Sequence, residues 1–148
     1  MRKVFLAMFV VLLGTASSVH ARNDSVSAAR AVMDAFMTTF NARDEAAWAD
    51  TLLFPHVRFA SGGVVVHETR EAFLQGMDFD EFARANNWDH SRWDSIEVIQ
   101  ADSEKVHFKV TFTRFNPAGE AYVTYDSLYI LQKIDGRWGI RARSSFAP

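Results

Sequence analysis

The feature that most constrains the fold is a regular alternation of apolar and polar residues in the second half of the chain. In residues 105–115, every second side chain from Val106 to Phe112 is apolar, which is the period of a strand with one buried face. Two turn signals, NPAG at 116–119 and DG at 135–136, favour tight connections between such strands. The pattern predicts four long antiparallel strands, at 88–101, 105–115, 121–134 and 137–146.

The first half of the chain carries helical periodicity instead. Apolar residues at spacings of three and four from Ala29 to Phe40 predict one helical face, with Asn23, Asp24 or Ser25 as the N-cap. Shorter elements are predicted next. A helix at 44–53 is capped by Asp44 and ended by Pro55, strands follow at 56–60 and 64–67, and a helical stretch capped by Thr69 runs to about Ala85 with an interruption at Gly76. The predicted fold class is α+β, with N-terminal helices packed on one curved, mostly antiparallel sheet and a conical cavity between them.

The first 21 residues have the composition of a secretory signal peptide. Arg2 and Lys3 precede an apolar run at 4–13, and small residues lead to Ala21. The run is shorter than the ~20 apolar residues that a membrane span needs. We therefore expect cleavage after Ala21, a secreted or periplasmic location, and one domain formed by residues 22–148.

Composition excludes several classes of function. The formal net charge of −2 favours neither nucleic acid nor, once the signal peptide is removed, a membrane surface. The chain has no Cys, so its stability must come from packing, to which 13 Phe and 4 Trp contribute. No HExxH motif, Gly-rich phosphate loop or GxSxG motif occurs, and no metal or cofactor is predicted.

Three segments, FNARD at 40–44, FPHVR at 54–58 and KIDGRWGI at 133–140, occur in an order and spacing that one large group of proteins shares. In these segments the chain resembles the NTF2-like superfamily, and within it the SnoaL-like group. Within that group it is most similar to a branch of secreted members that have no assigned reaction. The resemblance runs from about Asp24 to Phe146. It implies an NTF2-like cone over nearly the whole of the predicted domain.

The superfamily includes ketosteroid isomerases, polyketide cyclases, dehydratases and non-enzymatic binding or dimerisation domains, so the resemblance alone does not define a reaction. Ketosteroid isomerases carry an oxyanion-hole Tyr five residues before the Asn-Ala pair, where this chain has Phe36. Their general-base Asp corresponds to Ala60. Both departures argue against isomerase chemistry, because proton abstraction needs a base and a hydrogen-bond donor in those places.

Residues 88–94, WDHSRWD, form the densest polar and aromatic cluster in the chain. A regular strand would place Trp88, His90, Arg92 and Asp94 on one face and Trp93 on the other, so that the two indoles point apart. The first face is either the polar mouth of a pocket, with His90 as its acid/base, or a solvated strand end with an Arg–Asp pair.

Three other groups of residues could carry chemistry. His56 and Arg58 could act as an acid/base and as a carboxylate contact if their side of the strand borders the cavity; otherwise they form a surface face. Asp126, near Tyr125 and Tyr129, could be a base with a raised pKa or a structural carboxylate. Arg141 and Arg143, which share a predicted face with Ser145, could bind an anion, clamp a dimer partner or face solvent.

The leading hypothesis is a binding protein for a small apolar or amphipathic molecule. The alternatives are an enzyme of lyase, isomerase or cyclase type that uses His56, His90 or Asp126 as acid/base, and a homodimeric interaction module. The predicted ligand-binding residues are Phe36, Phe40, His56, Arg58, Trp88, His90, Trp93, Tyr125 and Tyr129.

Overall fold

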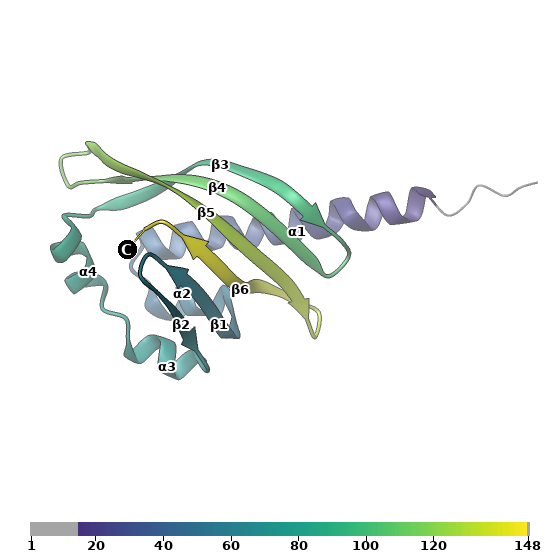
Figure 1. Cartoon of the computed structure of the whole chain (residues 1–148), viewed down its shortest axis with the longest axis horizontal. Helices are drawn as coiled ribbons and strands as arrows, with labels where there is room; N and C mark the ends of the chain where they lie inside the picture. The colour runs from purple at the N-terminus through teal and green to yellow at the C-terminus, as the bar shows by residue number, and fades with distance from the viewer. Residues whose placement is uncertain (1–14, 148) are drawn as a thin grey trace, which may run out of the picture.

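The computed structural model describes residues 15–147, in which helices pack against one face of a single curved sheet (Figure 1). The helices are α1 (Thr15–Asn41), α2 (Glu45–Asp50), α3 (Arg70–Gln75) and α4 (Phe79–Asn86). The strands are β1 (Leu52–Ala60), β2 (Gly63–His67), β3 (His90–Ala101), β4 (Lys105–Phe115), β5 (Ala121–Ile134) and β6 (Arg137–Ser145). The long helix α1 contacts β3, β4 and β6 and so spans the inner face of the sheet.

The sheet has the order β2-β1-β6-β5-β4-β3. All neighbouring strands pair antiparallel except β1 and β6, which are parallel. The predicted α+β class, with helices on a curved and mostly antiparallel sheet, is therefore confirmed.

The predicted start of the first helix was wrong. The helix α1 already includes the residues that were expected to cap it, 23–25. The Ser25 hydroxyl donates instead to the carbonyl of Asp102, 2.6 Å away in the loop before β4. The predicted signal peptide falls mainly on residues 1–14, which lie outside the described residues. No helix within 15–147 is long and apolar enough to cross a membrane.

The predicted end of the second helix was also wrong. Helix α2 stops at Asp50, and the chain enters β1 at Leu52, with a cis peptide between Phe54 and Pro55. The physical reason is pairing with a distant strand, since Leu52 lies opposite Ile140 of β6. The register of this pair shifts between residues 52 and 57, and such an irregularity accommodates a proline, which has no N–H to donate.

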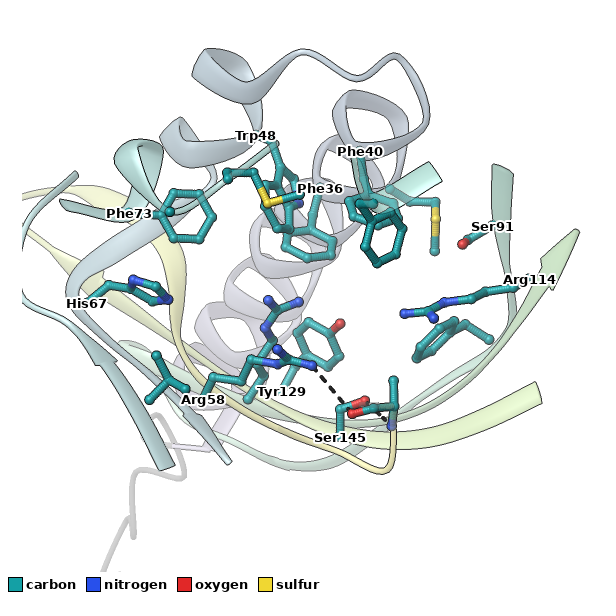
Figure 2. A pocket seen from close by; sticks show the side chains of 18 of the residues that line it. Phe36, Phe40, Trp48, Arg58, His67, Phe73, Ser91, Arg114, Tyr129 and Ser145 are labelled. Carbon is teal, nitrogen blue, oxygen red and sulfur yellow. Dashed lines mark hydrogen bonds between the residues drawn. The ribbon is translucent and has the colours of Figure 1, made fainter. Parts of the chain in front are cut away.

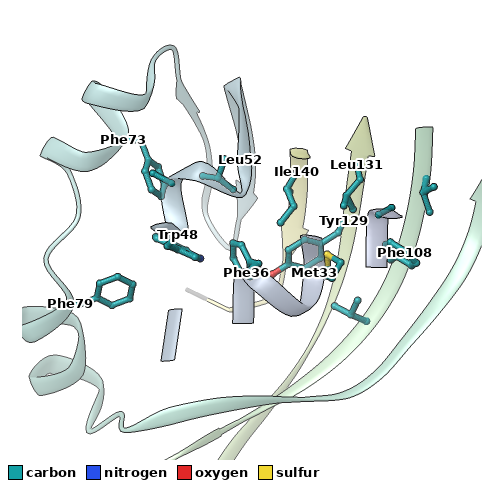
Figure 3. Packing of buried hydrophobic residues seen from close by; sticks show 14 of the residues in the cluster. Met33, Phe36, Trp48, Leu52, Phe73, Phe79, Phe108, Tyr129, Leu131 and Ile140 are labelled. Atoms are coloured by element: carbon teal, nitrogen blue, oxygen red, sulfur yellow. The ribbon is translucent and has the colours of Figure 1, made fainter. Parts of the chain in front are cut away.

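The core lies between α1, α2 and the inner face of the sheet (Figure 3). Met33 and Phe36 point from α1 toward the sheet, and Trp48 reaches them from α2. The sheet contributes alternate residues of its central strands, namely Val106, Phe108 and Val110 of β4, Tyr129 and Leu131 of β5, and Ile140 of β6. This packing fills one half of the cone and leaves the other half open.

Candidate functional site

The open half of the cone is a cavity of about 310 Å³ between the helices and the inner face of the sheet (Figure 2). Helices α1 and α2 supply one wall, residues from all six strands supply the opposite wall, and α3 and α4 lie at the side. The lining residues are Phe36, Met37, Phe40, Trp48, Arg58, Val65, His67, Phe73, Gly76, Met77, Phe82, Ser91, Trp93, Phe112, Arg114, Tyr129, Arg143, Ser145 and Ala147.

The apolar walls of the cavity are a connected group of aromatic rings. The ring centroid of Phe36 lies 5.3 Å from that of Trp48, 5.7 Å from that of Tyr129 and 6.4 Å from that of Trp93. The Trp93 indole is held in place because its Nε1–H donates to the carbonyl of Met33, 3.2 Å away. These contacts fix the shape of the walls, as expected for a preformed pocket.

The charged side chains that line the cavity, among the described residues, are three arginines. Arg58 and Arg143 are register partners in the parallel strands β1 and β6, and both line the cavity. Arg114 enters from β4, and Figure 2 shows it extending toward the middle of the cavity from the side opposite Arg58. Of the described residues, no Asp or Glu lines this cavity.

The guanidinium of Arg143 lies against aromatic rings. Arg143 lies over the rings of Phe36 and Trp48, with its Cζ 5.4 and 5.6 Å from the two ring centroids. Arg58 donates to the carbonyl of Ala147, 3.4 Å away. The cation–π contacts of Arg143 stabilise its guanidinium but supply no negative charge to balance it.

Two histidines lie near these arginines. His67 of β2 lines the cavity, whereas His56 of β1 is fully buried behind it, and their ring centroids are 6.5 Å apart. Burial, reinforced by the charge of Arg143, lowers the pKa of His56 to about 3. Burial and the same arginine also lower the pKa of His67. Both side chains are therefore neutral at pH 7, and His67 could accept a proton or a hydrogen bond from a ligand.

The structure brings five of the predicted ligand-binding residues to the cavity, namely Phe36, Phe40, Arg58, Trp93 and Tyr129. Their contact with a ligand stays a prediction. The other four do not line it. Trp88 and His56 are buried in the protein, Tyr125 packs beside Phe112, and His90 stacks on Phe115, 4.6 Å between centroids.

The candidate acid/base residues lie away from the cavity. Asp126 is on the outer face of β5, where it accepts a hydrogen bond from Thr111, and His90 bonds to the neighbouring Asp89. His56 has no path to the cavity space, since its side chain is fully buried and its Nδ1–H donates to the carbonyl of Ile140. The geometry supports none of these three as the acid/base of a cavity reaction. No group of three or more His, Asp or Glu within residues 15–147 could hold a metal ion.

The prediction that the two indoles of WDHSRWD point apart was wrong. Trp88 precedes β3, and Asn87 before it adopts a left-handed conformation, with φ of 47°. The Trp88 Nε1–H donates to the hydroxyl of Ser91, 2.9 Å away, on the inner face. Trp88 is buried next to Phe40, while Trp93 lines the cavity, so both indoles belong to the interior.

Sequence reasoning missed Arg114 and His67 as cavity residues and placed Arg143 incorrectly. Arg114 continues the inward alternation of Phe108, Val110 and Phe112, and this signal could have identified it. Arg143 was expected on the face opposite Ile140. An extra residue in β6, at the register shift beside residues 130 and 131, returns Arg143 to the inner face.

The cone formed by the helices and the sheet defines a class of fold, and the comparison with protein families identifies the same class. The family model described as "NTF2-like protein (DUF6841)" matches residues 24–146. The chain therefore belongs to this NTF2-like family. No curated protein sequence matches the chain.

Solved structures share the fold at low sequence identity. An NTF2-like protein with a cystatin-like fold from Novosphingobium aromaticivorans has a TM-score of 0.71 and 10% identity, over 91% of each chain. A protein of unknown function from Mycobacterium tuberculosis has a TM-score of 0.68 and 18% identity, over 89% of this chain and 76% of that chain. A ketosteroid isomerase-like protein from Erwinia carotovora atroseptica has a TM-score of 0.60 and 20% identity, over 85% of this chain and 99% of that chain.

Proposed function

We propose that the cavity binds a small apolar or amphipathic molecule and releases it unchanged. The observation that carries this proposal is a space of about 310 Å³ with aromatic walls and a few polar groups. Its volume falls within the range of about 300–1,000 Å³ that ligand pockets occupy. Phe36 and Ala60, where ketosteroid isomerases carry a donor and a base, favour binding over turnover.

Filling the cavity tests this proposal. Met37 lines the cavity from α1, and Met37→Trp would place a larger ring in the space. We expect this change to weaken binding of N-phenylnaphthylamine, a neutral dye that fluoresces in apolar sites, by at least about tenfold. The measurement is a fluorescence titration, with thermal unfolding as a check on folding.

The matched control is Ala35→Trp on the exposed side of the same helix. This variant should bind the dye as the parent chain does. Equal dye affinity of the parent, Met37→Trp and Ala35→Trp would exclude the cavity as the binding site, and so would an absence of dye binding by the parent chain.

A second candidate function is proton transfer on a bound ligand, as in an enzyme of lyase, isomerase or cyclase type. It is favoured by His67, a neutral imidazole on the cavity wall, rather than by His56, His90 or Asp126. The ketosteroid isomerase-like protein from Erwinia is in keeping with such chemistry on this fold. Deuterium uptake by phenylpyruvate in heavy water, faster than in buffer alone and lost on His67→Gln, would favour this candidate over simple binding.

Membership of the SnoaL-like group, secretion and homodimer formation are further parts of the proposal. The three motif segments support the first, and the composition of residues 1–21 supports the second. Mass spectrometry of the exported protein should give an N-terminus at Arg22, and intact Met1 would refute cleavage. Light scattering at micromolar concentration should give the dimer mass, and the monomer mass would refute the dimer.

A further inference from the structure

The geometry points to an anionic amphiphile as the ligand class. Its head is an oxyanion, such as a carboxylate, sulfonate or phosphate, held by Arg114 and Arg143, and its aromatic or aliphatic body lies against the rings of the cavity. This inference rests on the proposed binding function and adds the charge of the ligand to it.

The first observation behind this inference is the buried, neutral environment of Arg114. Its side chain is only 6% exposed, and it points into the cavity from β4. Its neighbours are neutral: the ring centroids of Phe82 and Tyr125 lie 5.1 and 5.2 Å from Cζ, and the guanidinium forms a hydrogen bond with the hydroxyl of Tyr122. Its Nε has no hydrogen-bond partner within the described part of the chain. A buried cation without a counterion costs free energy, and a ligand oxyanion on the cavity side of the guanidinium would supply the missing negative charge.

The second observation is the environment of Arg143. Arg143 stacks over two rings at the inner end of the cavity, and its Nε has no hydrogen-bond partner among residues 15–147. Its register partner in the neighbouring strand is another arginine, Arg58. Burial, and then the positive charge of Arg143, lower the pKa of Arg58. An oxyanion held by Arg143 would supply the negative charge that its ring contacts do not provide.

The charges of the residues that line the cavity determine which sign of charge a ligand should carry. Arg114 and Arg143 both line the cavity, and no Asp or Glu does, as far as residues 15–147 describe it. In a partly desolvated space such charges create a positive potential that attracts anions and repels cations. The planar fork of a guanidinium also fits the paired oxygens of carboxylates, sulfonates and phosphates. The aromatic walls require that the rest of the ligand be apolar.

A pair of dyes that differ in one group tests the inference. Anilinonaphthalene sulfonate carries a permanent sulfonate, and N-phenylnaphthylamine is the same molecule without it. We expect the parent chain to bind the sulfonate at least about tenfold more tightly than the neutral dye. Arg114→Gln and Arg143→Gln should each weaken sulfonate binding by about tenfold and leave neutral-dye affinity within about twofold.

Two further variants separate binding from folding. Arg92→Gln, on the outer face of β3 with a side chain 67% exposed, should change neither affinity. Lys at position 114 or 143 keeps the charge without the fork, so Arg114→Lys and Arg143→Lys should retain part of the preference for the sulfonate. Neutral-dye binding by each variant reports that the cavity is intact.

The outcomes distinguish this inference from the proposed function. Equal affinity for the two dyes, or equal losses of both on Arg114→Gln and Arg143→Gln, would overturn the anion site and leave the binding function standing. Absence of neutral-dye binding by the parent chain would overturn the binding function itself. A preference for the sulfonate that disappears only in the cavity arginine variants would establish the inference.

Discussion

Trp48→Ala is expected to lower the free energy of unfolding by about 3–5 kcal/mol, the usual cost of removing a large buried aromatic side chain. Trp48 is 3% exposed, and its ring centroid lies 5.3 Å from that of Phe36, 5.2 Å from that of Phe40 and 5.0 Å from that of Phe73. Removing the indole would leave a void that these rings can close only in part, since they are held by other contacts. Urea unfolding followed by circular dichroism measures the change.

Two variants serve as controls for this prediction. Trp48→Phe keeps a ring and removes an Nε1–H that has no hydrogen-bond partner in the described residues, so its cost should be clearly smaller. Phe146→Ala removes a ring that is 74% exposed, and its effect should stay within about 0.5 kcal/mol. Similar losses for Trp48→Ala and Phe146→Ala would contradict the packing described here.

Trp48 also connects the stability of the fold to the site. It belongs to the core, lines the cavity, and lies under the guanidinium of Arg143. The cavity is therefore a continuation of the core rather than a groove cut into the surface. Its walls are held by the same packing that stabilises the domain, which explains why the cone can stay partly open.

The long strands were predictable because their signals are local. Strands β4 and β5 begin and end at the predicted residues, 105–115 and 121–134, since alternation defines the strands and the turn NPAG separates them. The caps Asp44 and Thr69 were also predicted correctly, and both accept from a backbone N–H three residues on. Each of these features depends on residues within a few positions of one another.

The errors arise where distant segments decide the local structure. Pairing with β6 draws residues 52 and 53 into β1, although their composition suits a continued helix. Irregular registers in β3, between Trp93 and Ser95, and in β6, around Arg141, reverse the faces that simple alternation predicts. The candidate site was affected most, because the position of Arg143 depends on one such irregularity.

Acidification from pH 7 to pH 4.5 is expected to cost about 2–3 kcal/mol of unfolding free energy through His56 alone. The pKa of His56 falls from 6.5, its value in an unfolded chain, to about 3 in the folded protein, because burial and then the charge of Arg143 disfavour the imidazolium. The unfolded state therefore binds more protons between these two values. The contribution of His56 is fully present above pH 6.5 and is lost as the pH falls toward 3.

Carboxylates also titrate in this range, so the effect has to be isolated by comparison. His56→Gln keeps a donor for the carbonyl of Ile140 but cannot gain charge. Its urea-unfolding free energy should fall by about 2–3 kcal/mol less than that of the parent chain between pH 7 and pH 4.5. Parallel curves for the parent chain and His56→Gln would show that burial does not hold His56 neutral in the folded protein, and would contradict the prediction.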